Sequence, residues 1–119
     1  MSYVDGFVVP VPKTKLMAYF AMAKKAGKVW KEHGALEFHE SVADDVKMGK
    51  WTSFLRSVMI RRGETVVFSW IVYKSRKDRD RINATVMKDP RLAKMMDIKE
   101  IPFDAKRMIY GGFKVVVEA

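Results

Sequence analysis

Residues 65–73 read Thr-Val-Val-Phe-Ser-Trp-Ile-Val-Tyr, and they carry the strongest strand signal in the sequence. It is rich in β-branched and aromatic residues, which favour a pleated strand. Side chains alternate between the two faces of a strand. One face would carry Val66, Phe68, Trp70 and Val72, and the other would carry Val67, Ile71 and Tyr73. Because both faces are apolar, we expect other parts of the protein to cover both of them.

The segments before this strand predict two further strands and a long helix. Residues 3–11 form a predicted strand that is stopped by Pro10 and Pro12, which cannot donate to a sheet ladder. From about Thr14, apolar residues recur every three or four positions, which predicts a helix with Thr14 as its N-cap and Gly34 in its C-terminal turn. Residues 35–42 are a second predicted strand. A polar loop over residues 44–50 and an extended segment over residues 51–60 follow.

The segments after residue 73 complete the pattern. Ser75 is the predicted N-cap of a helix that runs to about Met87, and a short helix begins at Asp89 and Pro90 and extends through Met96. Residues 106–117 form the last predicted strand. Without residues 44–63, the order is strand–helix–strand–strand–helix–strand, which is the ferredoxin-like pattern. The sequence therefore predicts one α+β domain over residues 1–119, a βαββαβ fold with an antiparallel sheet and both helices on one face.

The two-sided apolar strands also predict an oligomer. An antiparallel sheet covered by helices on one face normally shows a polar face to water. Here the strand at 65–73 and the last predicted strand are apolar on both faces, and the helices can cover only one. The simplest cover for the other face is a second copy of the chain, packed sheet against sheet. We therefore expect a homodimer.

Composition restricts the chemistry and the setting. The chain carries a net charge of +9 and contains no cysteine, which excludes disulfides, thiolate metal sites and cysteine nucleophiles. The amino terminus has no signal-peptide pattern, and the most apolar segment, residues 66–73, is too short to span a bilayer. We expect a cytoplasmic protein that does not enter a membrane.

Several blocks of the sequence carry a family resemblance. They are residues 1–7, residues 32–36, the pair Asp44-Asp45, residues 65–70 and residues 102–113. Together they resemble the bacterial YbaA-like domain-of-unknown-function family. The resemblance implies a dimeric α/β barrel and assigns no activity. Ser41-Val42-Ala43 stand where the family tends to carry Cys, Trp and Gly, so any site that this stretch forms in relatives would be altered here.

Two histidines are the strongest acid–base candidates, and each also has a purely structural explanation. His33 or His39 could form a dyad with Asp44 or Asp45, because imidazole titrates near neutrality. However, His33 lies at a predicted helix end, where a cationic side chain favours the helix dipole. His39 lies on a strand and can face solvent. Neither has companion ligands at a metal-binding spacing, so we expect no metal and no cofactor.

Gly111-Gly112 and the aromatic residues point to packing and to a pocket. The glycine pair lacks the spacing of a phosphate-binding loop, and inside a strand such glycines mark a bulge or a close approach. An apolar cavity with a few polar anchors is the usual form of a small-molecule site. The residues we expect to line it are Tyr19, His33, His39, Trp51, Arg56, Arg107 and Tyr110. Other barrels of the superfamily hold their ligands, which are often hydrophobic or aromatic, between the sheet and the helices. The resemblance implies a ligand in the same place in this chain.

The basic run over residues 74–81 is the candidate for an anionic partner. Its Lys74, Lys77 and Arg81 share a helical face, but Asp78 and Asp80 are interleaved. The strand at 65–73 lacks the glycine-and-aromatic signature of RNA-recognition domains. We therefore do not expect nucleic-acid binding as the main function.

Two readings of the function stay open. The first is a small-molecule pocket, with cofactor-independent proton transfer or oxygenation of an activated aromatic as the reaction if the protein is an enzyme. The second is a non-catalytic interaction module with an anionic partner.

Overall fold

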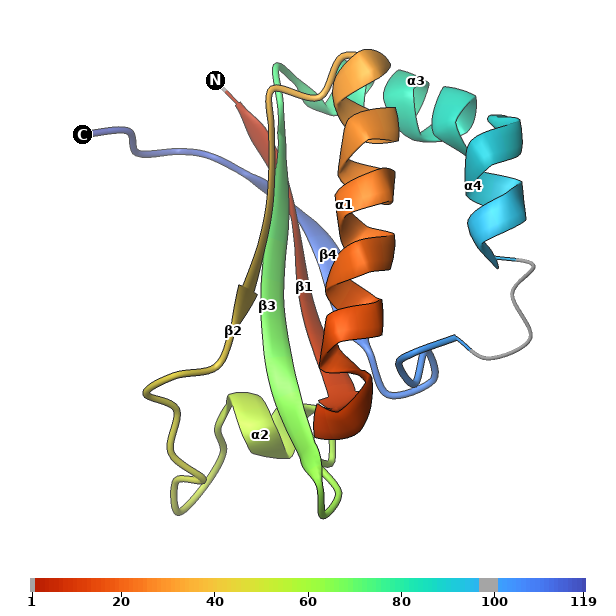
Figure 1. Cartoon of the computed structure of the whole chain (residues 1–119). Helices are drawn as coiled ribbons and strands as arrows, with labels where there is room; N and C mark the ends of the chain where they lie inside the picture. Colours follow the sequence, from red (N-terminus) through yellow and green to blue (C-terminus); the bar gives the residue numbers. More distant parts are fainter. Residues whose placement is uncertain (1, 97–100) are drawn as a thin grey trace.

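The computed structural model describes residues 2–96 and 101–119. Its elements follow one another in the order β1 (Tyr3–Pro12), a 3-10 turn (Lys13–Lys15), α1 (Leu16–Glu32), β2 (Glu37–Val42), α2 (Phe54–Ser57), β3 (Glu64–Tyr73), α3 (Arg76–Met87), α4 (Pro90–Met96) and β4 (Ile109–Lys114). Figure 1 shows α1, α3 and α4 grouped beside the sheet, with α2 at the end of the sheet farthest from α3 and α4. The layers are those of an α+β fold.

The four strands form one antiparallel sheet in the order β2-β3-β1-β4. Strands β1 and β3 pair along ten residues, from Tyr3 opposite Tyr73 to Pro12 opposite Glu64. Strand β4 pairs with β1 only as far as Val8, so Pro10 and Pro12 lie where β1 has no partner on that side. The prolines therefore cost no ladder bond to β4. This strand order confirms the predicted ferredoxin-like βαββαβ fold.

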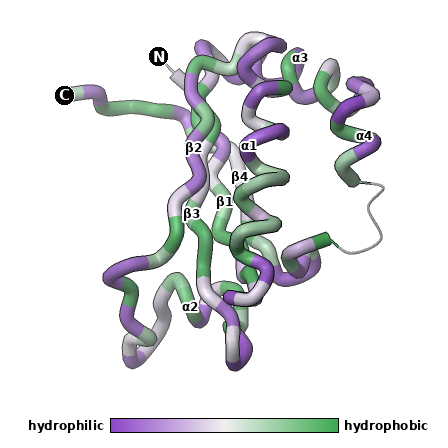
Figure 2. Tube along the Cα trace, in the orientation of Figure 1, coloured by the Kyte–Doolittle hydropathy of each residue, from purple (hydrophilic) through white to green (hydrophobic). Residues whose placement is uncertain are grey.

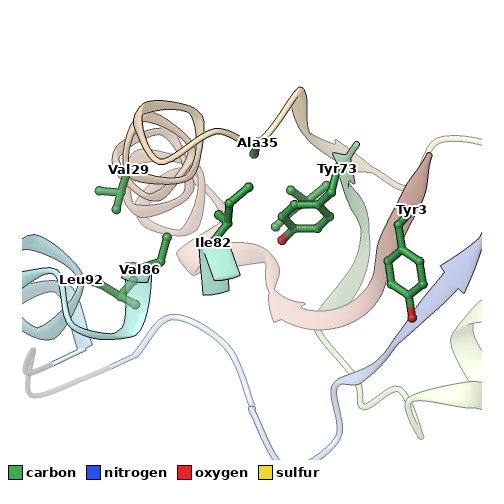
Figure 3. Packing of buried hydrophobic residues seen from close by; sticks show 8 residues of the cluster. Tyr3, Val29, Ala35, Tyr73, Ile82, Val86 and Leu92 are labelled. Atoms are coloured by element: carbon green, nitrogen blue, oxygen red, sulfur yellow. The ribbon is translucent and has the colours of Figure 1, made fainter. Parts of the chain in front are cut away.

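The helices cover the sheet face that carries Ile71 and Tyr73. Figure 3 shows the main core cluster, which includes Val29 from α1, Ile82 from α3 and Tyr73 from β3. A second cluster joins Tyr19 and Ala23 of α1 to the sheet. Burying an aliphatic side chain of this size stabilises a fold by about 1.5–3 kcal/mol, so these clusters hold the helices against the strands. Figure 2 shows α1 as mainly green in its first turns, with purple segments in its later turns.

The opposite sheet face is covered only at one end. There Val8 and Val66 pack against Val58, from the segment that joins β2 to β3. Beyond that segment the face is open and carries Phe68 (43% exposed), Ile109 (44%) and Phe113 (64%). The predicted two-sided apolar sheet is therefore present, and the described residues of the chain leave most of one face uncovered. We call this region, with Trp70 and Val4, the open face.

Three local predictions were wrong. Residues 51–60 were expected to be extended, but Ser53 caps the helix α2 by accepting from the Arg56 backbone N–H over 3.0 Å. Thr14 is not a helix cap, because it lies in the 3-10 turn and α1 begins at Leu16 with no side-chain cap. The last strand is shorter than residues 106–117 and spans Ile109–Lys114.

Other helix ends follow the expectation. Ser75 caps α3 by accepting from the Asp78 backbone N–H over 3.1 Å. Gly34 has a φ of +117°, a left-handed conformation that suits glycine in the turn after α1. Trp70, which we expected between two buried layers, lies on the open face and is only partly buried in the single chain.

Candidate functional site

A cavity of about 490 Å³ lies between the helices and the covered face of the sheet. Its walls include Phe7, Phe38, Met22 and Met87 as apolar residues, with polar groups at Asp5 and Glu40. A volume of this order is typical of sites that enclose small organic molecules, and so is a mostly apolar lining with a few polar groups. We treat this cavity as the candidate site.

One polar group of the cavity is the pair formed by Tyr19 of α1 and Glu40 of β2. The Tyr19 hydroxyl donates to Glu40 Oε1 over 2.8 Å. Burial raises the pKa of Glu40, while the hydrogen bonds from Tyr19 and Ser69 act in the opposite direction. Burial, followed by the charge of Glu40, raises the pKa of Tyr19. The pair is therefore a protonatable carboxyl held by a neutral phenol.

A second polar group surrounds Asp5 on β1. Asn83 Nδ2 donates to Asp5 Oδ2 over 3.5 Å, and Arg79 Nη1 lies 3.4 Å from Asp5 Oδ1. Asn83 Oδ1 in turn accepts from Tyr73 Oη over 3.0 Å and from Trp30 Nε1 over 3.1 Å. Burial, and then the charge of Asp5, raises the pKa of Tyr73. This network joins α1, α3 and the sheet around one carboxylate.

Sheet register separates the two acidic groups. Asp5 lies opposite Ile71, and Glu40 lies opposite Ser69, with strand β3 between them. Two strand spacings of about 4.8 Å and two residues of about 3.4 Å rise place their backbones about 12 Å apart. The cavity therefore has two distinct polar positions joined by apolar wall.

Two of the seven residues expected from sequence meet at this cavity. Tyr19 lines it and is buried. Tyr110 lines it from β4, stacks on Phe7 with ring centroids 6.1 Å apart and remains 72% exposed. Tyr110 therefore lies at the mouth of the cavity.

Two others hold the fold together. His33 follows α1, and its Nε2 lies 2.8 Å from Oδ2 of Asp89, just before α4. Arg107 is buried and bridges Oε2 of Glu64 over 2.6 Å and Oδ2 of Asp104 over 2.8 Å. Hydrogen bonds from Arg107 come first among the causes that lower the pKa of Glu64 and of Asp104. These contacts tie chain segments together and do not face the cavity.

The remaining three lie apart from the cavity. His39 lies on the opposite face of the sheet, where its ring stacks on Trp70 with centroids 4.8 Å apart. Trp51 is 86% exposed in the loop before α2. Arg56 donates from Nε to the Met48 carbonyl over 3.0 Å and fixes that same loop.

Sequence reasoning missed the polar residues that the structure places at the cavity. A signal for two of them was available. Asp5 lies between Tyr3 and Phe7, and Glu40 lies between Phe38 and Val42, so each charge interrupts an apolar face at the strand period of two. A charged side chain at such a position needs a partner or a function.

Gly112 explains part of the glycine pair in β4. A Cβ on Gly112 would stand 2.7 Å from Cε2 of Tyr3, so the Tyr3 ring occupies the space that a side chain would need. The expected close approach is therefore present, and a neighbouring side chain makes it. Tyr3 also accepts from Arg79 Nη2 over 3.2 Å, which links this packing to the network around Asp5.

A separate groove of about 680 Å³ runs between α1 and the edge strand β2. Lys24, Lys28 and Lys31 line it from the helix, at spacings of four and three residues. Lys31 Nζ also donates to the Leu36 carbonyl over 2.7 Å. The groove combines positive charge with a strand edge that has no neighbour in the sheet.

The described residues contain neither a metal-binding cluster nor a membrane-spanning helix. No cluster of three or more histidine, aspartate or glutamate side chains in residues 2–96 and 101–119 could hold a metal ion. Within the same ranges, no helix is long and apolar enough to cross a membrane.

Comparison with known proteins identifies the family. The family described as "Protein of unknown function (DUF1428)" matches residues 2–105. The Escherichia coli K12 protein called "Uncharacterized protein YbaA" is 49% identical over 118 residues, which is 99% of each chain. The protein of the same name from Shigella flexneri is also 49% identical over 99% of each chain. This chain belongs to that family.

A solved structure supports the fold. A protein described as a dimeric ferredoxin-like protein, from an uncultured marine organism, covers the whole chain with a TM-score of 0.60. The two sequences are 13% identical, so the similarity concerns the fold alone.

Proposed function

We propose that this member of the DUF1428 family is a homodimer that binds a small, mainly apolar organic molecule in the cavity between its sheet and its helices. The observation that carries the proposal is the cavity itself, about 490 Å³ in volume, with aromatic and methionine walls and two separate carboxyl groups. Well-packed interiors leave few voids larger than a water molecule. A space of this size beside the buried carboxyl group of Asp5 is costly to maintain unless it is used.

A thermal-shift screen tests the ligand. A molecule that binds only the folded state raises its apparent stability. We expect uncharged aromatic or aliphatic metabolites to raise the Tm of the wild type. Ala26 lines the cavity from α1, so Ala26→Phe should fill it and remove these shifts. Ala21→Phe, at an exposed position of the same helix, is the matched control and should keep them. Shifts that survive Ala26→Phe would place the ligand elsewhere.

The proposed dimer rests on the open face. This face includes an apolar hollow of about 510 Å³, where Gly6 and Gly111 lie opposite each other between Trp70 and Phe113. A Cβ on Gly6 would stand 3.9 Å from Phe113 Cε1 and one on Gly111 would stand 3.8 Å from it, so the Phe113 ring lies beside both glycines and offers an apolar surface to a second copy. The structural neighbour described as dimeric has the same fold, which supports the same assembly here. In such a dimer the partly exposed Trp70 would become buried.

Light scattering tests the dimer. We expect about twice the chain mass of 13.7 kDa at micromolar concentration. Phe113→Glu places a charge on the open face and should give monomers that retain native circular dichroism. Met17→Glu is the control, because Met17 is 87% exposed on α1, away from the open face. A wild-type protein that stays monomeric would contradict the assembly and leave the cavity proposal standing.

The lysine groove supports a second candidate function, a non-catalytic module that binds an acidic segment. An extended peptide can add to a free strand edge through main-chain hydrogen bonds. Beside β2, Lys24 and Lys28 would attract carboxylates on that peptide. We expect an oligoglutamate peptide to bind the wild type at low salt and to lose affinity in the double variant Lys24→Glu, Lys28→Glu. Binding equal to that of the wild type by the double variant Lys13→Glu, Lys77→Glu, which makes the same change in net charge at exposed positions outside the groove, controls for net charge.

A further inference from the structure

Asp5 is the least satisfied polar group of the cavity. Its side chain is 8% exposed and lies on the covered face of β1, between Tyr3 and Phe7. A carboxylate in such a place costs free energy unless hydrogen bonds replace its water. Oδ2 has one long bond, 3.5 Å from Asn83 Nδ2. Oδ1 makes no hydrogen bond to any residue in the described part of the chain.

The aromatic donors around Asp5 donate to Asn83, and Arg79 is shared among several partners. The Trp30 indole and the Tyr73 hydroxyl both donate to Asn83 Oδ1. Arg79 lies 3.4 Å from Asp5 Oδ1 as an ion pair, but it is shared, since its Nη2 donates to the Tyr3 hydroxyl and its Nε lies 3.0 Å from Asp80 Oδ1. Within the described residues this Nε makes no hydrogen bond. Arg79 therefore lowers the electrostatic cost of Asp5 without completing its hydrogen bonding.

Glu40, at the second polar position, differs from Asp5. Its Oε1 accepts from Tyr19, and a hydrogen bond with Ser69 also acts on the carboxyl. Glu40 has the partners that its place in the wall requires. The free acceptor capacity of the cavity is therefore concentrated at Asp5, which lines the cavity directly.

We propose that the ligand of this cavity is an uncharged molecule that presents a hydroxyl or N–H donor to the Asp5 carboxylate, with an apolar body packed against the Phe7 and Phe38 walls. The inference rests on the proposed function and names its ligand class. A cation is disfavoured because the Arg79 guanidinium lies beside Asp5. An anion is disfavoured because the ionisable residues of the lining are Asp5, Glu40, Arg79 and three tyrosines, so carboxyl groups outnumber basic groups. The cavity therefore disfavours anions, whereas the net charge of the whole chain, +9, attracts them.

Three matched probes test this inference. They are 1-naphthol, which offers a hydroxyl donor, 1-methoxynaphthalene, which has the same body without the donor, and 1-naphthoate, which is anionic. Binding is measured by calorimetry on the wild type. One hydrogen bond contributes about 0.5–1.5 kcal/mol, so 1-naphthol should bind about 2–10-fold more tightly than 1-methoxynaphthalene. The anion should bind most weakly of the three.

Two variants test whether Asp5 causes the preference for 1-naphthol over 1-methoxynaphthalene. Asp5→Leu removes the acceptor and should make 1-naphthol and 1-methoxynaphthalene bind equally. Asp5→Asn keeps a neutral acceptor and should retain part of the difference in affinity between 1-naphthol and 1-methoxynaphthalene. If Asp5→Leu does not fold, Asp5→Asn is the variant that tests the inference: a smaller difference than in the wild type supports it, and an unchanged difference contradicts it. Glu37→Gln, on the other face of β2, is the control and should leave the preference unchanged.

The outcomes separate the two proposals. Equal binding of 1-naphthol and 1-methoxynaphthalene to the wild type, or tightest binding of 1-naphthoate, overturns the donor inference and leaves the cavity as an apolar site. A preference for 1-naphthol that survives Asp5→Leu also overturns it. Binding of none of the three probes contradicts the proposed function, and the inference fails with it.

Discussion

Gly27 of α1 lies against the ring of Phe38 on β2, so closely that a Cβ on Gly27 would stand 2.8 Å from Phe38 Cδ1. Glycine in a helix interior costs about 1 kcal/mol relative to alanine. The missing side chain lets α1 approach the edge strand β2, and the packing that results offsets this cost. Phe38 in turn forms part of the cavity wall. The close approach of α1 to this ring therefore positions part of the wall of the candidate site.

We expect Gly27→Ala to destabilise the protein, although alanine is the better helix former. Overpacking of this kind costs about 1–3 kcal/mol, which exceeds the gain in helix propensity. Urea unfolding measures the change. In the background of Phe38→Ala, where the ring is absent, the same Gly27→Ala change should become neutral or stabilising. A Gly27→Ala effect that is the same in both backgrounds would show that the Phe38 ring is not the obstacle.

The parts of the fold that the sequence predicted are those with strong local patterns. The strand at residues 65–73 is apolar on both faces, and Ser75 is followed at once by a helix that it caps. The segment around α2 was misjudged because its helix is four residues long, too short to display an apolar period. Its helix signal in the sequence is Ser53, a residue type that favours the N-cap position, and the structure places it there.

The candidate site was harder to predict because it depends on contacts between distant segments. Asp5 and Asn83 are 78 positions apart and meet only when β1 enters the sheet beneath α3. Histidines attracted attention in the sequence because of their chemistry, yet His33 binds Asp89 and His39 stacks on Trp70, both outside the cavity. Residue type alone did not reveal which face each side chain would occupy.

A second prediction concerns Arg107, whose side chain is 5% exposed. It joins the segment before β4 to Glu64 at the start of β3, and it also donates to the Met59 carbonyl over 3.1 Å. Removing one member of a buried ion pair costs about 3–5 kcal/mol, because the partner charge stays buried. We expect Arg107→Ala to lower the unfolding free energy by that amount.

The control for Arg107 is an exposed pair on the same molecule. Arg76 lies 4.0 Å from Asp80 on the surface of α3, and Arg76→Ala should change the unfolding free energy by about 0.5 kcal/mol or less. Both are measured by chemical denaturation under the same conditions. Similar losses for the two variants would show that the Arg107 cluster does not act as a buried pair.

A third prediction concerns nucleic acid. The arginines of α3 are engaged by acids, since Arg79 lies near Asp5 and Asp80, and Arg81 lies 3.7 Å from Asp78. These pairs reduce the field that phosphates would meet. We expect weak, sequence-independent binding of oligonucleotides at low salt that disappears near about 0.15 M salt, because counterion release dominates such binding.

Fluorescence anisotropy against salt measures this expectation. Submicromolar affinity at about 0.15 M salt would contradict it, since non-specific contacts seldom bind that tightly. In that case charge reversal at Arg76 and Arg81, both on the exposed side of α3, would show whether this helix is responsible. Binding that survives the reversal would direct attention to Arg61 and Arg62 in the turn before β3.

The last prediction uses the pH dependence of stability to test the Tyr19–Glu40 pair. Burial raises the folded-state pKa of Glu40 above its ordinary value of 4.5, so the folded protein binds this proton more tightly than the unfolded chain does. The contribution of Glu40 to stability is then complete below about pH 4.5 and is lost as pH rises through the folded-state pKa. Glu40→Gln removes the titration and keeps an oxygen that can accept from Tyr19. We therefore expect the unfolding free energy of the wild type, minus that of Glu40→Gln, to fall as pH rises and then to level off.

Tyr19→Phe removes a hydrogen bond that lowers the pKa of Glu40, so in that background the fall should extend to higher pH. Denaturation between pH 4 and pH 8 measures both differences, because every other titrating group cancels between each pair of proteins. A difference that is flat, or that rises with pH, would mean that Glu40 is already solvated as a carboxylate in the folded state.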